Sequence, residues 1–273
     1  MNDHARSYLF VPGTRPERFD KALAADADIV VLDLEDAVDA SAKAEARAQV
    51  GQWAAQCEAL TLQRIALRIN DTASPWFAED MTLLRDTRIR TVMLPKVEGA
   101  AQVARVFGTN PDVHVLPLLE SAHGLARSGE IAAAPGVRRL VFGTIDFAAD
   151  LDLDIDDDPQ PLAEAAARIA LASRVAGLAA PVAGVTPQLH DEARLLADWS
   201  WFRRRGFGAK LCIHPRQVDP VHAALVPDAA AVEWAQRVVA ADSAGHGATS
   251  VDGRMVDRPV VLQALRVLRR AGL

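Results

Sequence analysis

The amino-acid sequence predicts an α/β fold, a (β/α)8 TIM barrel with a C-terminal helical extension. Two patterns lead to this prediction: short aliphatic runs at roughly regular intervals, and helix-forming stretches between them. The length of 273 residues is also near the roughly 250 residues typical of such barrels. A doubly wound open sheet is the main competitor. That fold usually carries a glycine-rich dinucleotide turn, and the sequence has none.

Eight aliphatic runs have the composition of buried parallel strands. Each is too short for a buried helix and is bounded by proline, glycine, asparagine or aspartate. In chain order, the predicted strands are 8–12, 29–33, 64–69, 91–95, 114–120, 139–143, 182–186 and 209–213.

The stretches between these runs are rich in alanine, arginine and glutamate, which favour helix. In one of them, Leu162, Ala166 and Ile169 can share a single helical face. Pro161 stands where a first helical turn tolerates proline. The clearest predicted helices are 15–26, 40–56 and 161–179.

The chain is predicted to contain a TIM-barrel catalytic domain, 1–218, and a C-terminal helical arm or lid, 219–273. This tail has a helical stretch at 229–241 and a glycine-containing link at 245–255, and it is amphipathic after Pro259. Eight strand–helix units do not require such a tail. We expect it either to cover the barrel mouth or, as the preferred interpretation, to pack on a neighbouring subunit.

The composition argues against several classes of partner. The formal net charge of −6 disfavours binding to nucleic acid or to an anionic membrane. No run of about 18 apolar residues and no signal-peptide pattern is present. Cys57 and Cys212 lie far apart and suggest reduced thiols. We therefore expect a cytoplasmic protein that binds neither nucleic acid nor membrane.

Two acidic residues follow predicted strands, although buried strands are normally apolar. Glu120 closes the fifth run and Asp146 follows the sixth. In a TIM barrel, the C-terminal strand ends form the active site. Two carboxylates, completed by water and substrate oxygens, are how Mg²⁺ is usually held, whereas no cysteine–histidine cluster favours zinc. The alternative is that these acids cap the following helices or pair with Arg68.

Arg68 ends the third predicted strand, in the motif LRIND. A guanidinium at this position could grip a substrate carboxylate with two hydrogen bonds. Beside a divalent metal it could also stabilise a developing oxyanion. The alternative is a plain ion pair with Glu35 or Asp36.

Three acids, Asp33, Glu35 and Asp36, follow the second predicted strand closely. They would repel one another unless a cation or a metal-bound water lay among them. One interpretation is that they order water around the metal. An equally plausible interpretation is a local ion-pair network, for which the candidate cations are Arg15, Arg68 and Lys96.

Several motifs together resemble the citrate lyase beta-subunit-like (CitE-like) proteins of the HpcH/HpaI aldolase family. The resemblance covers nearly the whole chain and implies a TIM barrel assembled as a homotrimer or hexamer. It also implies a Mg²⁺-dependent carbon–carbon lyase acting on acyl-CoA thioesters of short hydroxy acids. The motifs are LFVPGTRPERFDKALAADADIVVLDLEDAV, LRIND, LPKVE, LLESAHGL, FGTIDFAADLD, GFGAKLCIHPRQV and VDGRMVDRPVV.

The resemblance implies specific roles for residues near the predicted strand ends. Glu120 and Asp146 would be the Mg²⁺ ligands. Arg68 would hold the carboxylate or keto oxygen of the 2-oxo acid half of the substrate. We also expect Arg15 and Lys96 to contribute to substrate binding.

Further catalytic roles also follow from the resemblance. Glu35 and Asp36 would organise water at the metal. In related malyl- and citramalyl-CoA lyases, an aspartate from the C-terminal arm of a neighbouring subunit enters the site. Asp257, in GRMVDRP, matches that position.

The implied reaction is cleavage of a malyl-, citramalyl- or citryl-CoA-like substrate to acetyl-CoA and a 2-oxo acid. Two departures from the family pattern bear on the substrate: Ile145 replaces the usual polar residue before Asp146, and 182–191 lacks the expected acidic and aromatic pattern. The alternatives are an aldolase acting on free 2-oxo hydroxy acids, an acyl-CoA thioesterase, and a non-catalytic binding subunit.

Overall fold

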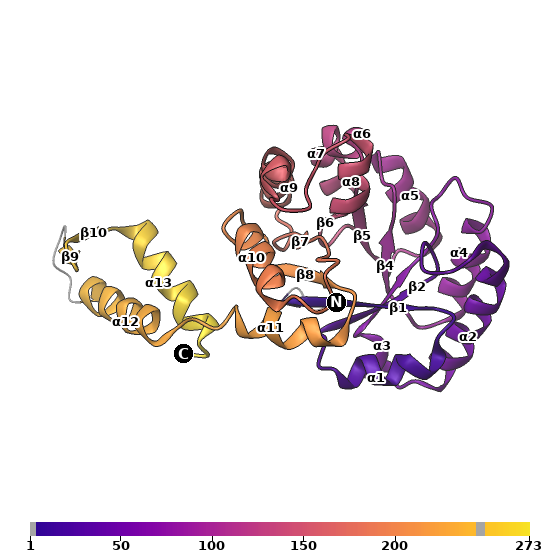
Figure 1. The fold of residues 1–273 in the computed structure, drawn as a ribbon, viewed down its shortest axis with the longest axis horizontal. Helices are drawn as coiled ribbons and strands as arrows, with labels where there is room; N and C mark the ends of the chain where they lie inside the picture. Colours follow the sequence, from indigo (N-terminus) through magenta and orange to yellow (C-terminus); the bar gives the residue numbers. More distant parts are fainter. Residues whose placement is uncertain (1–3, 244–248) are drawn as a thin grey trace. The chain divides into compact units, whose positions relative to one another are not determined.

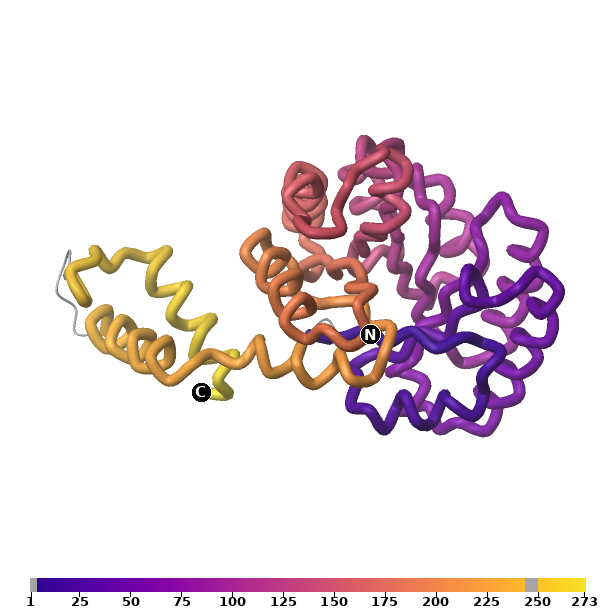
Figure 2. Tube along the Cα trace, in the orientation of Figure 1, coloured from indigo at the N-terminus to yellow at the C-terminus, as the bar shows by residue number. Residues whose placement is uncertain are grey.

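The protein is described here by a computed structural model that covers residues 4–243 and 249–273. Two compact units are distinguished, one ending at Val221 and the other formed by His222–Leu273. The boundary between them lies inside helix α11 (Val218–Ala223). Figures 1 and 2 show the path of the chain through each unit.

The first unit contains a closed barrel of eight parallel strands in sequential order, which confirms the predicted TIM barrel. Pairing of β8 with β1 closes the barrel, with Ser7 opposite Lys210. Every strand overlaps the run from which it was predicted. The strands are β1 (Ser7–Pro12), β2 (Ile29–Asp33), β3 (Ile65–Arg68), β4 (Thr91–Leu94), β5 (His114–Leu119), β6 (Val141–Phe142), β7 (Val182–Ala183) and β8 (Ala209–Cys212).

The helices of this unit surround the barrel (Figure 1). The three predicted helices are each observed as one 3-10 turn leading into an α-helix: η1 (Pro16–Arg18) and α1 (Phe19–Ala24), η2 (Ala40–Ala42) and α2 (Lys43–Gln56), η3 (Gln160–Leu162) and α9 (Ala163–Val175). The others are α3 (Ala59–Leu62), α4 (Phe77–Asp86), α5 (Ala100–Thr109), α6 (Ala122–Ala126), α7 (Ser128–Ala132), α8 (Thr144–Asp150), α10 (Glu192–Arg203) and η4 (Pro215–Gln217).

Side chains fill the barrel interior. Alternate residues of each strand point inward, so Ala209 and Leu211 of β8 join the interior cluster whereas Lys210 and Cys212 do not. A filled interior leaves the C-terminal rim as the place where a ligand can bind. The buried cluster comprises Ala5, Tyr8, Ile29, Val31, Ala66, Met93, Leu116, Leu118, Val141, Val182, Ala209 and Leu211.

The second unit is built from two helices and a hairpin: α12 (Ala229–Ser243), β9 (Thr249–Val251), β10 (Arg254–Val256) and α13 (Arg258–Arg270). It has its own apolar cluster, which includes Val238 of α12 and Val261 of α13. Both predicted helical stretches of the tail are therefore observed as helices. No helix of the described residues is long and apolar enough to cross a membrane.

The predicted glycine-containing link, 245–255, differs from the structure. Its first residues lie outside the described part of the chain, but the remainder forms the antiparallel hairpin of β9 and β10. Asp252 and Gly253 have φ values of 52° and 74° at the turn. Positive φ at both central residues is the signature of the type I′ turn that favours a two-residue hairpin. For this part of the tail, the prediction of a link is wrong.

Candidate active site

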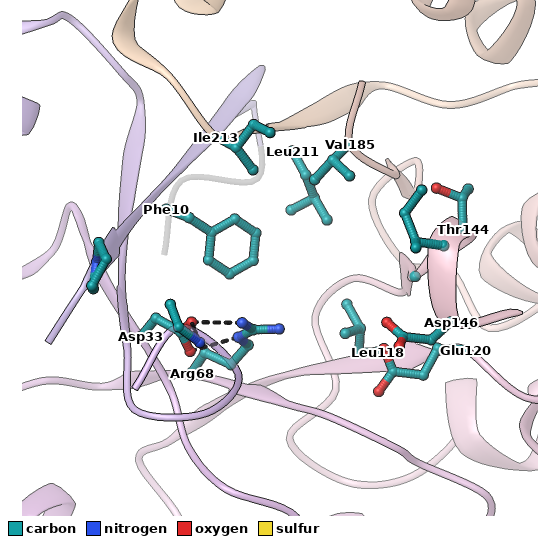
Figure 3. A pocket seen from close by; sticks show the side chains of 14 residues that line it. Phe10, Asp33, Arg68, Leu118, Glu120, Thr144, Asp146, Val185, Leu211 and Ile213 are labelled. Atoms are coloured by element: carbon teal, nitrogen blue, oxygen red, sulfur yellow. Dashed lines mark hydrogen bonds and ion pairs between the residues drawn. The ribbon is translucent and has the colours of Figure 1, made fainter. Parts of the chain in front are cut away.

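A cavity of about 280 Å³ opens at the C-terminal ends of the barrel strands. Strand ends and the turns after them line it, as Figure 3 shows. Phe10 comes from β1, Asp33 from β2, Arg68 from β3, Glu120 follows β5, and Asp146 belongs to α8. The structure thus brings the two predicted metal ligands and Arg68 to one cavity.

The carboxylates of Glu120 and Asp146 lie side by side in this cavity (Figure 3). Glu120 is 5% exposed, and its Oε1 accepts a hydrogen bond of 2.6 Å from the backbone N–H of Lys96. Asp146 is exposed, and its carboxylate has no hydrogen-bond or ion-pair partner among the described residues. Helix α6 is capped by Ser121, which accepts from Gly124 N. Neither acid therefore serves as a helix cap or as a partner of Arg68.

Gly143 makes room for the Glu120 side chain. A Cβ atom at position 143 would lie 2.6 Å from Glu120 Oε2 and 2.7 Å from Glu120 Cβ. Both distances are far below van der Waals contact, so any larger residue would displace the carboxylate. The turn between β6 and α8 is thus shaped to seat Glu120 beside Asp146.

Lys96 connects the Glu120 carboxylate to the acidic turn after β2. Its φ is 53°, a left-handed conformation that costs a non-glycine residue about 1–3 kcal/mol. In this conformation the backbone N–H faces Glu120, and Nζ lies 2.9 Å from Glu35 Oε1. The described residues that line the cavity do not include Lys96. Its side chain pairs with Glu35, and its contribution to substrate binding stays a prediction.

Arg68 is held in place by Asp33 rather than mainly by Glu35 or Asp36. Arg68 Nε and Nη2 donate to the two carboxylate oxygens of Asp33 at 2.7 and 2.6 Å. Nη1 lies 3.0 Å from Glu35 Oε2, and the guanidinium carbon lies 4.8 Å from the centre of the Phe10 ring. Two parallel hydrogen bonds and a stacked ring fix the plane of the guanidinium.

The acids after β2 form the ion-pair network that was one of the two interpretations of the sequence. Glu35 is buried between Arg68 and Lys96. Burial raises the pKa of Glu35 to about 7, although the two cations oppose the shift. Arg15 is not part of this network: it is exposed, its Nη1 lies 3.9 Å from Glu17, and it does not line the cavity.

A second group of buried polar residues fixes the turn that carries Glu35. Lys43 Nζ donates to the carbonyl oxygens of Leu34 and Glu35 at 2.8 and 2.7 Å. Asn70 Nδ2 donates to Leu34 O at 3.0 Å and to Asp80 Oδ2 at 2.7 Å. Asp80 is completely buried. Sequence reasoning missed Lys43 and Asp80, because neither belongs to a strand end.

We expect Asp80→Ala to destabilise the fold by about 1–3 kcal/mol for each buried donor left unpaired. The donors are the backbone N–H and the Nδ2 of Asn70, which donate to Asp80 Oδ2, and Nη1 of Arg47, which donates to Asp80 Oδ1 at 3.0 Å. Urea unfolding measures the loss. Glu79→Ala is the matched control, because Glu79 is an exposed acid on the same helix. Equal stability of the two variants would contradict the structural role of Asp80.

Asp257 belongs to the second unit, where it is the N-cap of α13. Its Oδ1 accepts a hydrogen bond of 3.2 Å from Val260 N. The side chain is exposed. This capping role is a local one and leaves one carboxylate oxygen for other contacts.

A family model described as HpcH/HpaI aldolase/citrate lyase matches residues 6–215. The chain belongs to this family. A citrate lyase subunit beta-like protein of Mycobacterium tuberculosis is 36% identical, covering 97% of this chain and 95% of that protein. A (3S)-malyl-CoA thioesterase of Cereibacter sphaeroides is 32% identical, covering 97% and 94%.

Solved structures of this family agree with the fold. CitE of M. tuberculosis in complex with magnesium, acetoacetate and coenzyme A has a TM-score of 0.89 and 35% identity, covering 99% of this chain and 100% of that one. The citrate lyase beta subunit of M. tuberculosis, complexed with oxaloacetate and magnesium, has a TM-score of 0.75 and 34% identity, covering 83% and 100%.

Proposed function

We propose that the protein is a Mg²⁺-dependent carbon–carbon lyase that cleaves a short hydroxyacyl-CoA to acetyl-CoA and a 2-oxo acid. The observation that carries this proposal is the pair of carboxylates, Glu120 and Asp146, in one cavity with the guanidinium of Arg68. The complex of the relative CitE with magnesium, acetoacetate and coenzyme A supports it. Malyl-, citramalyl- and citryl-CoA are the candidate substrates.

The donor set in the cavity fits Mg²⁺. Glu120 Oε2 and the Asp146 carboxylate would hold the ion, and Mg²⁺ is usually bound through one or two carboxylates with water and substrate oxygens. The described residues contain no group of three or more His, Cys, Asp and Glu side chains arranged for a metal, as a structural zinc site would require. When bound, Mg²⁺ supplies a Lewis acid for the oxygens of the 2-oxo acid half.

Arg68 orients the substrate and stabilises negative charge. Asp33 occupies one edge of its guanidinium, and Glu35 and Asp36 lie 3.0 and 3.5 Å from Nη1. The N–H groups that these acids leave free would bind a carboxylate or keto oxygen of the substrate. Because Asp33 and Phe10 hold the guanidinium still, little reorganisation is needed as charge develops. Glu35 and Asp36 position Arg68 and order water beside it.

Cleavage requires two proton movements. A base removes the proton of the substrate hydroxyl, and the C–C bond breaks as the C=O bond of the 2-oxo acid forms. The bonding electron pair passes to the α-carbon of the thioester, giving the enolate of acetyl-CoA. A proton returns to that carbon, and we assign this donation to Asp257 of a neighbouring subunit.

We expect Asp257→Asn to lose cleavage by about 10²–10³-fold while its Mg²⁺-dependent binding of pyruvate or oxaloacetate stays within about threefold of the wild type. The amide can still accept the hydrogen bond from Val260 N that caps α13. Steady-state rates and calorimetric titrations separate the two effects. Unchanged cleavage in this variant would limit Asp257 to its capping role.

Binding of Mg²⁺ is expected to release a proton near neutral pH. Burial, reinforced by the charge of Asp146, raises the pKa of Glu120 to about 8, although the N–H of Lys96 opposes the shift. Below that pH a proton competes with the cation, so the Mg²⁺ affinity should fall about tenfold per pH unit. Calorimetry in buffers of different ionisation enthalpy counts the proton. Equal affinity at about pH 6.5 and about pH 9 would contradict this assignment.

Product analysis tests the proposed reaction. Malyl-, citramalyl- and citryl-CoA are each incubated with the protein and Mg²⁺, and thiol release, acetyl-CoA and 2-oxo acid are measured. Equal amounts of acetyl-CoA and 2-oxo acid are expected. The 32% identity to a (3S)-malyl-CoA thioesterase favours hydrolysis as the second candidate. In that case free CoA and a hydroxy acid would appear without any 2-oxo acid, and the lyase proposal would fail.

A further inference from the structure

The wall of the cavity is divided into a polar and an apolar part. Asp33, Arg68, Glu120 and Asp146 lie along one part, with Leu118 between Arg68 and Glu120, and Figure 3 shows aliphatic side chains and a phenyl ring along the other. Phe10, Val185, Leu211 and Ile213 form this apolar part, and Ile145, next to Asp146 in the chain, also lines the cavity.

Two of these apolar side chains are unusually exposed. Ile145 is 44% exposed and Ile213 is 38% exposed, although both line the cavity. Ile145 directly precedes Asp146 in the chain. A substrate bound to the ion that the two carboxylates would hold would therefore have an aliphatic surface immediately beside it. Burial of that surface favours binding of a substrate with an apolar substituent.

The cavity lining offers cationic partners for only one carboxylate of a substrate. Arg68 is the only cationic side chain among the described residues that line it, and Asp33 already pairs with two of its nitrogens. With one dication on Glu120 and Asp146, the lining groups carry no net charge. A first substrate carboxylate can bind the dication and Arg68. A second would lie against apolar side chains without a partner, which is costly.

We propose that the 2-oxo acid half accepted by this protein is a monocarboxylate with an apolar substituent, and that dicarboxylic 2-oxo acids are disfavoured. This inference rests on the proposed function and narrows it to the class of citramalyl-CoA-like substrates, whose 2-oxo acid carries an alkyl group. Ile145 and Ile213 are the residues that determine this specificity.

A matched pair of ligands tests the inference. Oxaloacetate and 4-methyl-2-oxopentanoate have nearly the same shape, because an isopropyl group replaces the second carboxylate. Each is titrated calorimetrically into the Mg²⁺-loaded protein, with pyruvate as the smallest member of the series. We expect pyruvate and the isopropyl compound to bind about tenfold or more tightly than oxaloacetate. Oxaloacetate binding equally or more tightly would overturn the inference.

A charged variant provides an independent test. Ile145→Lys places a cation beside the proposed site, and partial exposure of Ile145 leaves room for it. The affinity for oxaloacetate relative to 4-methyl-2-oxopentanoate should rise about tenfold or more, whereas the control Ile145→Met should keep the wild-type ratio. An unchanged ratio in a folded Ile145→Lys protein would overturn the role of this residue.

The outcomes distinguish the inference from the proposed function. If no 2-oxo acid binds in a Mg²⁺-dependent manner, the proposed function fails and the inference fails with it. If Mg²⁺-dependent binding occurs but oxaloacetate is preferred, the proposed function stands and only the inferred specificity is wrong.

Discussion

Asp146→Asn is expected to lose Mg²⁺ binding and to lower lyase turnover by about 10²–10³-fold or more. Asparagine has nearly the shape of aspartate but lacks its charge, and the Asp146 carboxylate has no partner among the described residues that the amide could disturb. The fold should therefore be unaffected. Glu120→Gln should behave alike, because the glutamine oxygen can still accept the hydrogen bond from Lys96 N.

Asp152→Asn is the matched control for these two variants. Asp152 is exposed and lies just beyond α8, where its φ of 53° is one that asparagine adopts readily. Turnover and calorimetric Mg²⁺ titrations should match the wild type. Full activity of Asp146→Asn or Glu120→Gln at low Mg²⁺ would remove the basis of the ligand assignment.

Arg68→Met is expected to have two large effects, one on turnover and one on stability. Turnover should fall by about 10²–10³-fold, because the substrate loses its cationic partner and the developing charge is no longer stabilised. Asp33, which is 1% exposed, would become a buried carboxylate without its ion pair. Breaking such a pair costs about 3–5 kcal/mol, which urea unfolding would detect.

The double variant Asp33→Asn/Arg68→Met separates these two effects. Removing the charge of Asp33 together with that of Arg68 should recover part of the lost stability, because no buried carboxylate then remains unpaired. Turnover should stay low. Arg68→Lys should also remain impaired, because an ammonium group cannot make the two parallel hydrogen bonds to Asp33. Recovery of activity in the double variant would show that Arg68 acts only through stability.

The strands and the carboxylate pair were predictable from the sequence because their signals are local. Each strand is a short aliphatic run bounded by turn residues, so its neighbours in the chain suffice to identify it. Glu120 and Asp146 each follow such a run, and parallel strands of a barrel place their C-terminal ends on one rim. Once the fold class was predicted, no further information was needed to predict that the two acids lie in one cavity.

The partner of Arg68 was not predictable because it depends on strand register. Asp33 and Arg68 lie directly opposite each other on β2 and β3. A shift of one residue would have sent the two side chains to opposite faces, and nothing in the two segments alone fixes that register. Glu35 was therefore an equally reasonable partner from the sequence.

Buried polar contacts were missed for a similar reason. Lys210 is fully buried, donates to Gly184 O at 2.9 Å, and has its pKa lowered to about 8 by burial. Lysine is usually exposed, so the sequence gives no indication of this contact between neighbouring strands. The hairpin at Asp252–Gly253 did have a local signal, because an aspartate–glycine pair is typical of type I′ turns. Its flanking strands are only three residues long, which made them easy to overlook.

Anomalous diffraction from crystals soaked with Mn²⁺, a substitute for Mg²⁺, tests the central claim most directly. A single anomalous peak is predicted in the cavity, about 2.1 Å from one oxygen of Glu120 and one of Asp146. A peak among Asp33, Glu35 and Asp36, with none between Glu120 and Asp146, would contradict the assignment of the metal site.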